Sequence, residues 1–272
     1  MNLNINKNEP VMVTGATGFI ASWLVKKLMD NGITVHAAVR NTDDSIKLAH
    51  LKNLENGSSG KIIFFKSDLL EDGSYLEAME GCSTVFHTAS PFNFSVTDNK
   101  KGFIDPAFIG TQNVLKSVNN TESVKRVVLT SSCAAIYGDA ADIAMYPGQV
   151  MTEEMWNTSS TETHNAYSYS KTIAEKEAWD ISKKQTRWKL VVVNPCFVFG
   201  PSISKNPTSG SFELISQLAD GSMKSGAAPF EIGAVDVKDV VEAHFKAAYL
   251  ESANGRNILY NKSLSILDIA NI

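Results

Sequence analysis

The segment from residue 11 to residue 40 restricts the possible folds of this chain more than any other part. An apolar run at 11–14 is typical of a buried strand, and the turn at 15–18 contains two glycines. Apolar residues at helical spacing follow, and a second strand-like run covers 33–39. A strand, a glycine turn, a helix and a strand within about 30 residues form the smallest unit that binds a dinucleotide, whereas an ordinary turn between a strand and a helix is the alternative. Because glycines let backbone N–H groups approach a pyrophosphate, we predict cofactor contacts at Gly15, Thr17, Gly18, Phe19 and Ile20.

Strand-like and helix-like segments alternate along the rest of the chain. Further apolar runs of the buried-strand type lie at 61–66, 84–89, 127–130 and 190–195. Alternation of this kind predicts an α/β fold with a doubly wound parallel sheet of the Rossmann type, in which helices cover both faces. Ligands bind such sheets outside the carboxyl ends of the strands, so functional residues are expected there.

The length of 272 residues allows one large domain with a smaller lobe. We expect a dinucleotide-binding domain at 1–196 and mainly a substrate lobe at 197–272, with 236–250 returning to the main core. Two long polar stretches, 139–164 and 197–232, interrupt the alternation. Connections of this length in a compact domain are generally lids or small added elements, so we expect substrate specificity to reside there.

Tyr167 and Lys171 lie four residues apart in a segment, 167–184, that is predicted to be helical. Residues at this spacing share one face of a helix, so the ammonium would lie one turn from the phenol and lower its pKa. The strand at 127–130 would deliver the adjacent serines 131–132 to the same end of the sheet. A phenol, an ammonium and a serine hydroxyl beside a nicotinamide suit proton transfer to or from a carbonyl oxygen. The alternative is an amphipathic helix on which Lys171 faces solvent.

The end of the second strand favours NADPH over NADH. Chains selective for NAD usually place an acid here, whereas this strand ends in Arg40 and no acid occurs before Asp43. A guanidinium suits a 2′-phosphate, and Lys47 would add a second cation, but an Arg40 that merely stacks on the adenine would serve either cofactor. Asp68 is expected either to accept from the adenine amino group or to cap the next helix. Further cofactor contacts are expected at Leu69, Thr88, Ala89, Ser90, Pro195 and Val198.

Composition excludes several classes of protein. Apolar residues make up 43% of the chain but form no run long enough to span a membrane, and the polar start lacks a secretory core. A net charge of −4 argues against a nucleic-acid partner. Three widely separated cysteines indicate reduced thiols, and no two histidines sit at metal-binding spacing, so no metal is implied. We expect a cytoplasmic monomer or homodimer that binds a small-molecule carbonyl substrate.

Six segments together carry a specific resemblance that runs almost from end to end. The chain resembles an extended short-chain dehydrogenase/reductase, in the branch that holds dihydroflavonol reductases, cinnamoyl-CoA reductases and fungal-type methylglyoxal and ketone reductases. Ala21, in place of a third glycine, and the segment 87–92 look more like the methylglyoxal and ketone reductases than the plant flavonoid enzymes. The six segments are 14–20, 87–92, 126–132, 165–179, 194–201 and 235–240.

The resemblance implies an NADPH-dependent reductase of aldehydes or ketones. In that family pattern Ser132, Tyr167 and Lys171 take the catalytic roles, and Lys171 also binds the nicotinamide ribose together with Tyr167. Arg40 and Lys47 take the 2′-phosphate site. The substrate pocket is expected to include Phe92, Phe94, Cys133 and Tyr137.

Two other functions remain as alternatives. A sugar-nucleotide epimerase or dehydratase would need a basic pocket for a diphosphate, and the stretch 197–232 offers only Lys205 and Lys224 as basic residues. A regulatory module that binds NADPH without catalysis would have no need of a proton donor. The chain stops at Ile272, in the predicted start of a late helix, whereas proteins of the resembled family continue for several dozen residues that complete the substrate lobe. We therefore expect an incomplete substrate lobe, either because the chain is truncated or because its pocket is open on one side.

Overall fold

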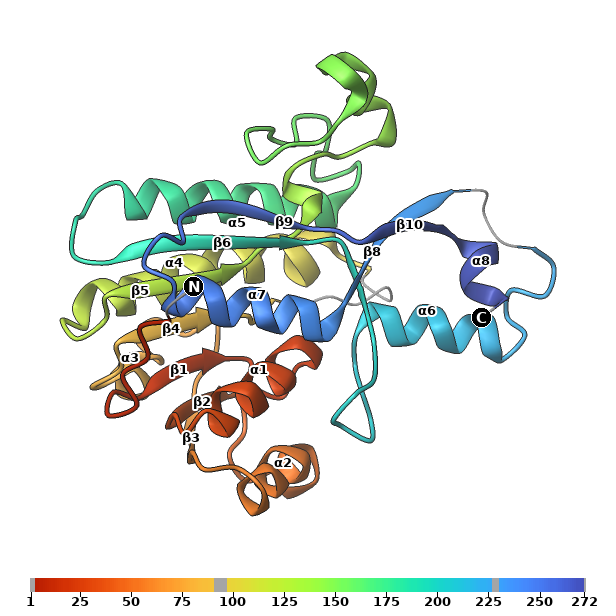
Figure 1. Cartoon of the computed structure of the whole chain (residues 1–272). Coiled ribbons are helices and arrows are strands. Elements are labelled where there is room, and N and C mark those ends of the chain that lie inside the picture. Colours follow the sequence, from red (N-terminus) through yellow and green to blue (C-terminus); the bar gives the residue numbers. More distant parts are fainter. Residues whose placement is uncertain (1–2, 91–96, 227–229, 272) are drawn as a thin grey trace.

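The computed structural model describes residues 3–90, 97–226 and 230–271, and their central feature is a large parallel sheet (Figure 1). Its described strands are β1 (Val11–Thr14), β2 (Val35–Val39), β3 (Ile62–Lys66), β4 (Thr84–His87), β5 (Arg126–Thr130), β6 (Lys189–Pro195) and β9 (Gly255–Leu259). They lie in the order β3-β2-β1-β4-β5-β6-β9, and each pair of neighbours is parallel. The predicted α/β fold of the Rossmann type is confirmed.

Helices cover both faces of this sheet. They are α1 (Phe19–Asp30), α2 (Ser45–Lys52), α3 (Leu76–Met79), α4 (Asp105–Asn120), α5 (Ala166–Ser182) and α7 (Val237–Tyr249). In β1, Val11 and Val13 pack with the apolar side chains of α1 and α7, whereas Met12 packs with those of α3 and α4. Because successive side chains of a strand point to opposite faces, a continuous apolar strand requires this two-sided cover.

The direction in which strands are added reverses between β1 and β4. From β1 the chain builds outward through β2 to β3, and it then returns to add β4, β5 and β6 on the other side. The connections after β1 and β4 therefore diverge at the carboxyl edge of the sheet. Ligands of open α/β sheets bind in the crevice that such a reversal leaves.

A smaller lobe stands beside the carboxyl edge, on the right in Figure 1. It contains a second sheet of β7 (Phe197–Phe199), β8 (Glu231–Asp236) and β10 (Lys262–Ser265), with the helices α6 (Gly210–Ala219) and α8 (Ile266–Ala270). Between β8 and β10 the chain returns from this lobe to the large sheet, first in α7 and then in β9, and the strand β9 was not expected. The division near residue 196 stays a prediction.

Short helical turns join the larger elements, and all of those named below except η1 lie toward the carboxyl edge. They are η1 (Asn53–Asn56), η2 (Lys100–Ile104), η3 (Cys133–Ala135), η4 (Ala140–Met145) and η5 (Pro147–Gln149). The polar stretch at 139–164, drawn in green, holds η4 and η5 and extends away from the sheet in Figure 1. Thus the long insertion predicted from polarity contains small helical elements of its own.

Candidate active site

The turn between β1 and α1 requires glycine for two reasons. Gly15 has a φ of +59°, and a Cβ atom there would lie 3.0 Å from the Ala89 Cβ. The left-handed backbone and the close approach of the chain after β4 both exclude a side chain. α1 begins at Phe19, and the unpaired N–H groups of its first turn carry partial positive charge. No acidic residue in that turn neutralises this charge. We call the turn at 15–18 together with the first turn of α1 the glycine cradle, and it suits a phosphate group.

The structure places the predicted cofactor residues along the carboxyl edge of the sheet. Thr88, Ala89 and Ser90 directly follow β4, and Pro195 ends β6. Ala89, Ser90 and Lys171 line one small cavity of about 20 Å³, so the end of β4 meets the predicted catalytic helix. The other predicted positions are Gly15, Thr17, Gly18, Phe19 and Ile20 at the β1–α1 turn, Arg40 after β2, Lys47 in α2, Asp68 and Leu69 after β3, and Val198 in β7.

A short hydrogen-bond chain fixes the end of β4. The Thr14 hydroxyl accepts from the backbone N–H groups of Thr88 and Ala89, at 3.0 and 2.9 Å. With both acceptor positions used, that hydroxyl donates to the His87 Nδ1 at 3.0 Å. Burial and the nearby Lys171 ammonium lower the pKa of His87 to about 3, so its ring stays neutral. The small residues after β4 are therefore held in place beneath the predicted cofactor.

The residues predicted for the adenosine end lie close to solvent. Arg40 and Lys47 are both exposed. The Asp68 carboxylate accepts from the Leu70 N–H at 2.9 Å and so caps a local turn, while the next helix, α3, begins only at Leu76. Neither of the two roles weighed for Asp68 describes this contact, since it caps a turn rather than a helix. Its contact with adenine stays a prediction.

Ser132 and Tyr167 meet at the carboxyl end of β5. A hydrogen bond joins their side chains, and the Ser132 Oγ also accepts from the Ala134 N–H at 3.2 Å. The Lys171 Nζ lies 5.8 Å from the centre of the Tyr167 ring, one helical turn along α5. The hydroxyl of the neighbouring Ser131 instead donates to Glu175 at 2.6 Å. The structure thus separates two serines that residue type alone leaves equivalent.

The expected lowering of the tyrosine pKa is not what the structure shows. Burial raises the pKa of Tyr167 above its ordinary value, and the hydrogen bond with Ser132 opposes this only in part. The reason is that a phenolate at this site would lose its hydration. Burial also lowers the pKa of Lys171 to about 8, because the residue is only 8% exposed. The solvent-facing alternative for Lys171 is therefore wrong.

Cys133 and Tyr137, predicted to line the substrate pocket, flank the Ser132 turn. Hydrogen bonds join the Cys133 thiol to the side chains of Tyr137 and Cys196. The hydrogen bond from Cys133, together with burial, raises the pKa of the Cys196 thiol. The other two predicted pocket residues, Phe92 and Phe94, lie outside the described residues.

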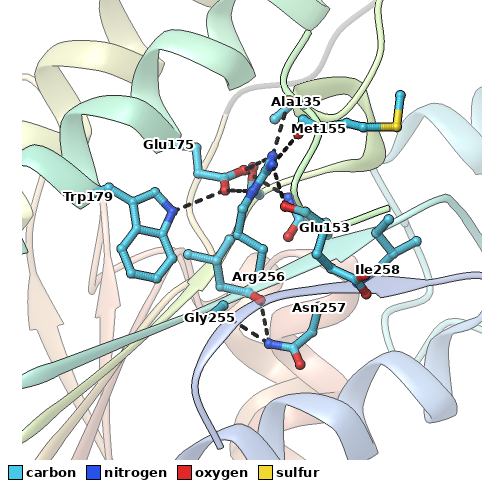
Figure 2. A network of polar contacts seen from close by, with 12 residues as sticks. Ala135, Glu153, Met155, Glu175, Trp179, Gly255, Arg256, Asn257 and Ile258 are labelled. Carbon is cyan, nitrogen blue, oxygen red and sulfur yellow. Dashed lines mark hydrogen bonds and ion pairs between the residues drawn. The ribbon is translucent and has the colours of Figure 1, made fainter. Parts of the chain in front are cut away.

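Several residues at the site were not predicted from the sequence. Phe103 in η2 stands edge-on to the Tyr167 ring, with 6.0 Å between ring centres. Glu175, four residues after Lys171 on the same helical face, binds Arg256 of β9 in a buried ion pair, drawn in Figure 2. Helical spacing was a signal for Glu175, but no local pattern marks Arg256 as its partner. Phe103 also carries no signal beyond being apolar.

The described part of the chain has neither a metal-binding cluster nor a membrane-spanning helix. Within it, no group of three or more His, Cys, Asp and Glu side chains is arranged to hold a metal ion. Likewise, no described helix has the length and apolar character needed to cross a membrane.

Comparison with known proteins places the chain among enzymes. The model of a family described as NAD-dependent epimerase/dehydratase matches residues 11–261. Cinnamoyl-CoA reductase CAD2 of Medicago truncatula is 38% identical over 270 residues, which span 98% of this chain and 80% of that protein. Anthocyanidin reductase of Arabidopsis thaliana is 35% identical over 278 residues, spanning 97% of this chain and 79% of that protein.

A solved structure gives the same result. Yeast methylglyoxal/isovaleraldehyde reductase Gre2, complexed with NADPH, superposes with a TM-score of 0.84 at 30% identity. The superposition covers 96% of this chain and 80% of the yeast chain. These relatives confirm the resemblance to extended short-chain dehydrogenases/reductases that the six sequence segments carry.

Proposed function

The chain belongs to the NAD-dependent epimerase/dehydratase family, and we propose on that premise that it reduces aldehydes or ketones with Tyr167 as the proton donor. It is an NADP-dependent oxidoreductase that acts on carbonyl groups, as its reductase relatives are. Among the carbonyl compounds, we propose methylglyoxal, dihydroflavonol or a related compound as the substrate.

The observation that carries this proposal is the side-chain hydrogen bond between Ser132 and Tyr167, one helical turn from Lys171. When bound, NADPH supplies a hydride for the carbonyl carbon. Tyr167 gives its phenolic proton to the developing alkoxide, and the raised pKa keeps that proton in place until it is needed. Ser132 holds the same oxygen by a hydrogen bond. The Lys171 ammonium then stabilises the phenolate left on Tyr167.

The residues present fit an NADP cofactor. The Gly15 cradle leaves space that a Cβ would fill, and the N-terminus of α1 suits its pyrophosphate. Thr14 and His87 hold the small residues after β4, on which the cofactor would lie. Exposed at the far end, Arg40 and Lys47 are the proposed partners of the 2′-phosphate.

The alternatives receive less support from the site. A diphosphate-sugar pocket needs cations that converge, but Lys205 and Lys224 are both exposed. A purely regulatory module is disfavoured because the protein's relatives are reductases.

Oxidation of NADPH, and separately of NADH, tests the proposed function. The substrates are methylglyoxal, a branched aliphatic aldehyde, an aromatic aldehyde and a bulky ketone. For Tyr167→Phe we expect kcat to fall by about 10³-fold while NADPH fluorescence reports unchanged binding. Tyr169→Phe, the same change two residues along α5, is the control and should keep wild-type turnover. If Tyr167→Phe keeps its turnover, this proton donor is wrong, and if the wild type reduces no carbonyl in the panel, the substrate class is wrong.

A further inference from the structure

Glu175 is a buried carboxylate for which the proposed reaction has no role. It lies on α5, one turn beyond Lys171 and two turns beyond Tyr167. Its side chain is 0% exposed, although carboxylates are almost never fully buried without partners. Such a group is retained only where its contacts compensate for the lost hydration. Its contacts therefore indicate what it does.

Four different residues donate to this carboxylate (Figure 2). Oε1 accepts from the Arg256 Nε at 2.5 Å and from the Trp179 Nε1 at 3.3 Å. Oε2 accepts from the Ser131 Oγ at 2.6 Å and from the Asn194 Nδ2 at 2.8 Å. Because all four partners donate, the site is built for the ionised form of Glu175.

The same partners hold the turn that carries Ser132. Ser131 precedes Ser132 directly, and the Asn194 Nδ2 donates to the Ser132 carbonyl oxygen as well, at 3.2 Å. Because both partners of this atom are acceptors, it must be the amide nitrogen of Asn194, and not its oxygen, that faces them. Arg256 donates from its Nη2 to the carbonyl oxygen of Ala135, at 3.1 Å. The Ser132 turn is thus tied on both sides to a single carboxylate and its partners.

Arg256 extends these ties to the long insertion. Its guanidinium donates to the carbonyl oxygens of Glu153 and Met155 and stacks on Trp156, with 3.8 Å from Cζ to the ring centre. These carbonyls and the ring compensate for burial of the guanidinium, and Glu175 neutralises its charge. The insertion, β9 and α5 therefore meet at the ion pair.

Glu175 also supplies the negative charge that faces Lys171. Both residues line the same cavity of about 20 Å³. His87, which enters from β4, is neutral, and α4 contributes the uncharged Ala107 and Thr111. The end of β5 contributes the uncharged Leu129, Thr130 and Ser131. The attraction of Glu175 acts against the burial that lowers the pKa of Lys171.

We propose that Glu175 is a positioning residue of the reductase site, one that holds the Ser132 turn in place and keeps Lys171 charged. The inference rests on the proposed function, because Ser132 and Lys171 matter only if they take part in the reaction. Glu175 thereby affects both the position of the Ser132 hydroxyl and the charge of the Lys171 ammonium.

The pH dependence of kcat/KM separates these two effects from a merely structural role. Glu175→Gln removes the charge, which favours the neutral amine, so we expect the alkaline limb to move down by about one pH unit. Glu175→Asp keeps the charge but shortens the side chain by one methylene group, which weakens the contacts that hold the Ser132 turn. We therefore expect kcat to fall about tenfold while the alkaline limb of the pH profile stays in place. Glu177→Gln is the matched control, since Glu177 lies on the same helix but accepts from Gln112 instead, and its profile should equal that of the wild type.

A second measurement does not depend on turnover. Titration of the Lys171 ¹³Cε signal by NMR, in the full chain without substrate, should show the same downward shift in Glu175→Gln. Should that variant fail to fold because Arg256 is left unpaired, Glu175→Gln/Arg256→Gln removes both charges and carries the test. An unmoved Lys171 titration in the folded variant overturns the proposal. If the wild type reduces no carbonyl, the proposed function fails instead, and the NMR titration still decides whether Glu175 sets the Lys171 charge.

Discussion

The two ends of the carboxyl edge differ in how firmly their side chains are held. At the proposed catalytic end, which comprises Ser132, Tyr167 and Lys171, buried contacts reach these residues from neighbouring strands and from the helix itself. At the proposed adenosine end, Arg40 and Lys47 are exposed to solvent. Groups that move a proton need fixed geometry, whereas charges that select a cofactor act over a longer range and tolerate motion. Substitutions at the two ends should therefore change different quantities.

After Tyr167→Phe, the largest effect is expected at the same end of the carboxyl edge, from Ser132→Ala. Loss of a hydrogen bond to the developing alkoxide should lower kcat by about 10²–10³-fold with little change in NADPH binding. Ser131→Ala is the matched control, because its hydroxyl binds Glu175 and not Tyr167, and kcat should fall less than about tenfold. Steady-state kinetics on both variants checks this. Equal losses of kcat in the two variants would show that Ser131 and Ser132 do not have the different contacts, with Glu175 and Tyr167, that the structure gives them.

The next effect concerns the cradle between the two ends. Gly15→Ala places a side chain in a left-handed conformation and against Ala89, so the Kd for NADPH should rise by about 10–100-fold. Gly73→Ala is the control, because its φ of +76° carries the same strain but its nearest contact is a Leu76 side chain at 3.6 Å. Fluorescence titration measures both Kd values. A cradle that binds no phosphate would leave the Kd unchanged in both variants.

A smaller effect is expected at the adenosine end. Arg40→Asp replaces a cation by an acceptor for the ribose hydroxyl, so the ratio of kcat/KM for NADPH over NADH should fall about tenfold or more, with kcat nearly unchanged. Lys61→Asp makes the same change of charge on another exposed residue, just before β3 at the amino edge of the sheet, and should leave the ratio unchanged. A ratio that stays high in Arg40→Asp would mean that another group recognises the 2′-phosphate.

A different kind of effect, on stability rather than on turnover or cofactor binding, is expected at the packed end. Burial lowers the pKa of His87 to about 3, whereas an unfolded histidine titrates near 6.5. The unfolded chain therefore takes up the proton first, so the stability from this group is complete above about pH 6.5 and is lost as pH falls toward 3. The free energy of unfolding, measured with urea at several pH values between 6 and 4, should fall with decreasing pH in the wild type. In His87→Gln this fall should be smaller by about 1.4 kcal/mol per pH unit.

Much of the fold was predictable because its signals are local. The apolar runs at 11–14, 33–39 and 127–130 coincide with β1, β2 and β5 within two residues. The helix predicted at 167–184 is observed at Ala166–Ser182. The edge strand β9 was missed because a glycine and two polar residues, Arg256 and Asn257, precede its only two apolar residues. Periodicity identifies a strand that is buried on both faces far better than one at an edge.

By itself, the sequence indicated the α/β class with a parallel sheet, the glycine turn after the first strand, and a Tyr and a Lys one helical turn apart. Each of these depends on residues that are near neighbours along the chain. Only the tertiary structure decided that Ser132, and not Ser131, meets Tyr167, that burial raises the tyrosine pKa, and that Glu175 binds a residue 81 positions away. Hydration and long-range contacts set these properties, and both arise only when distant segments pack together.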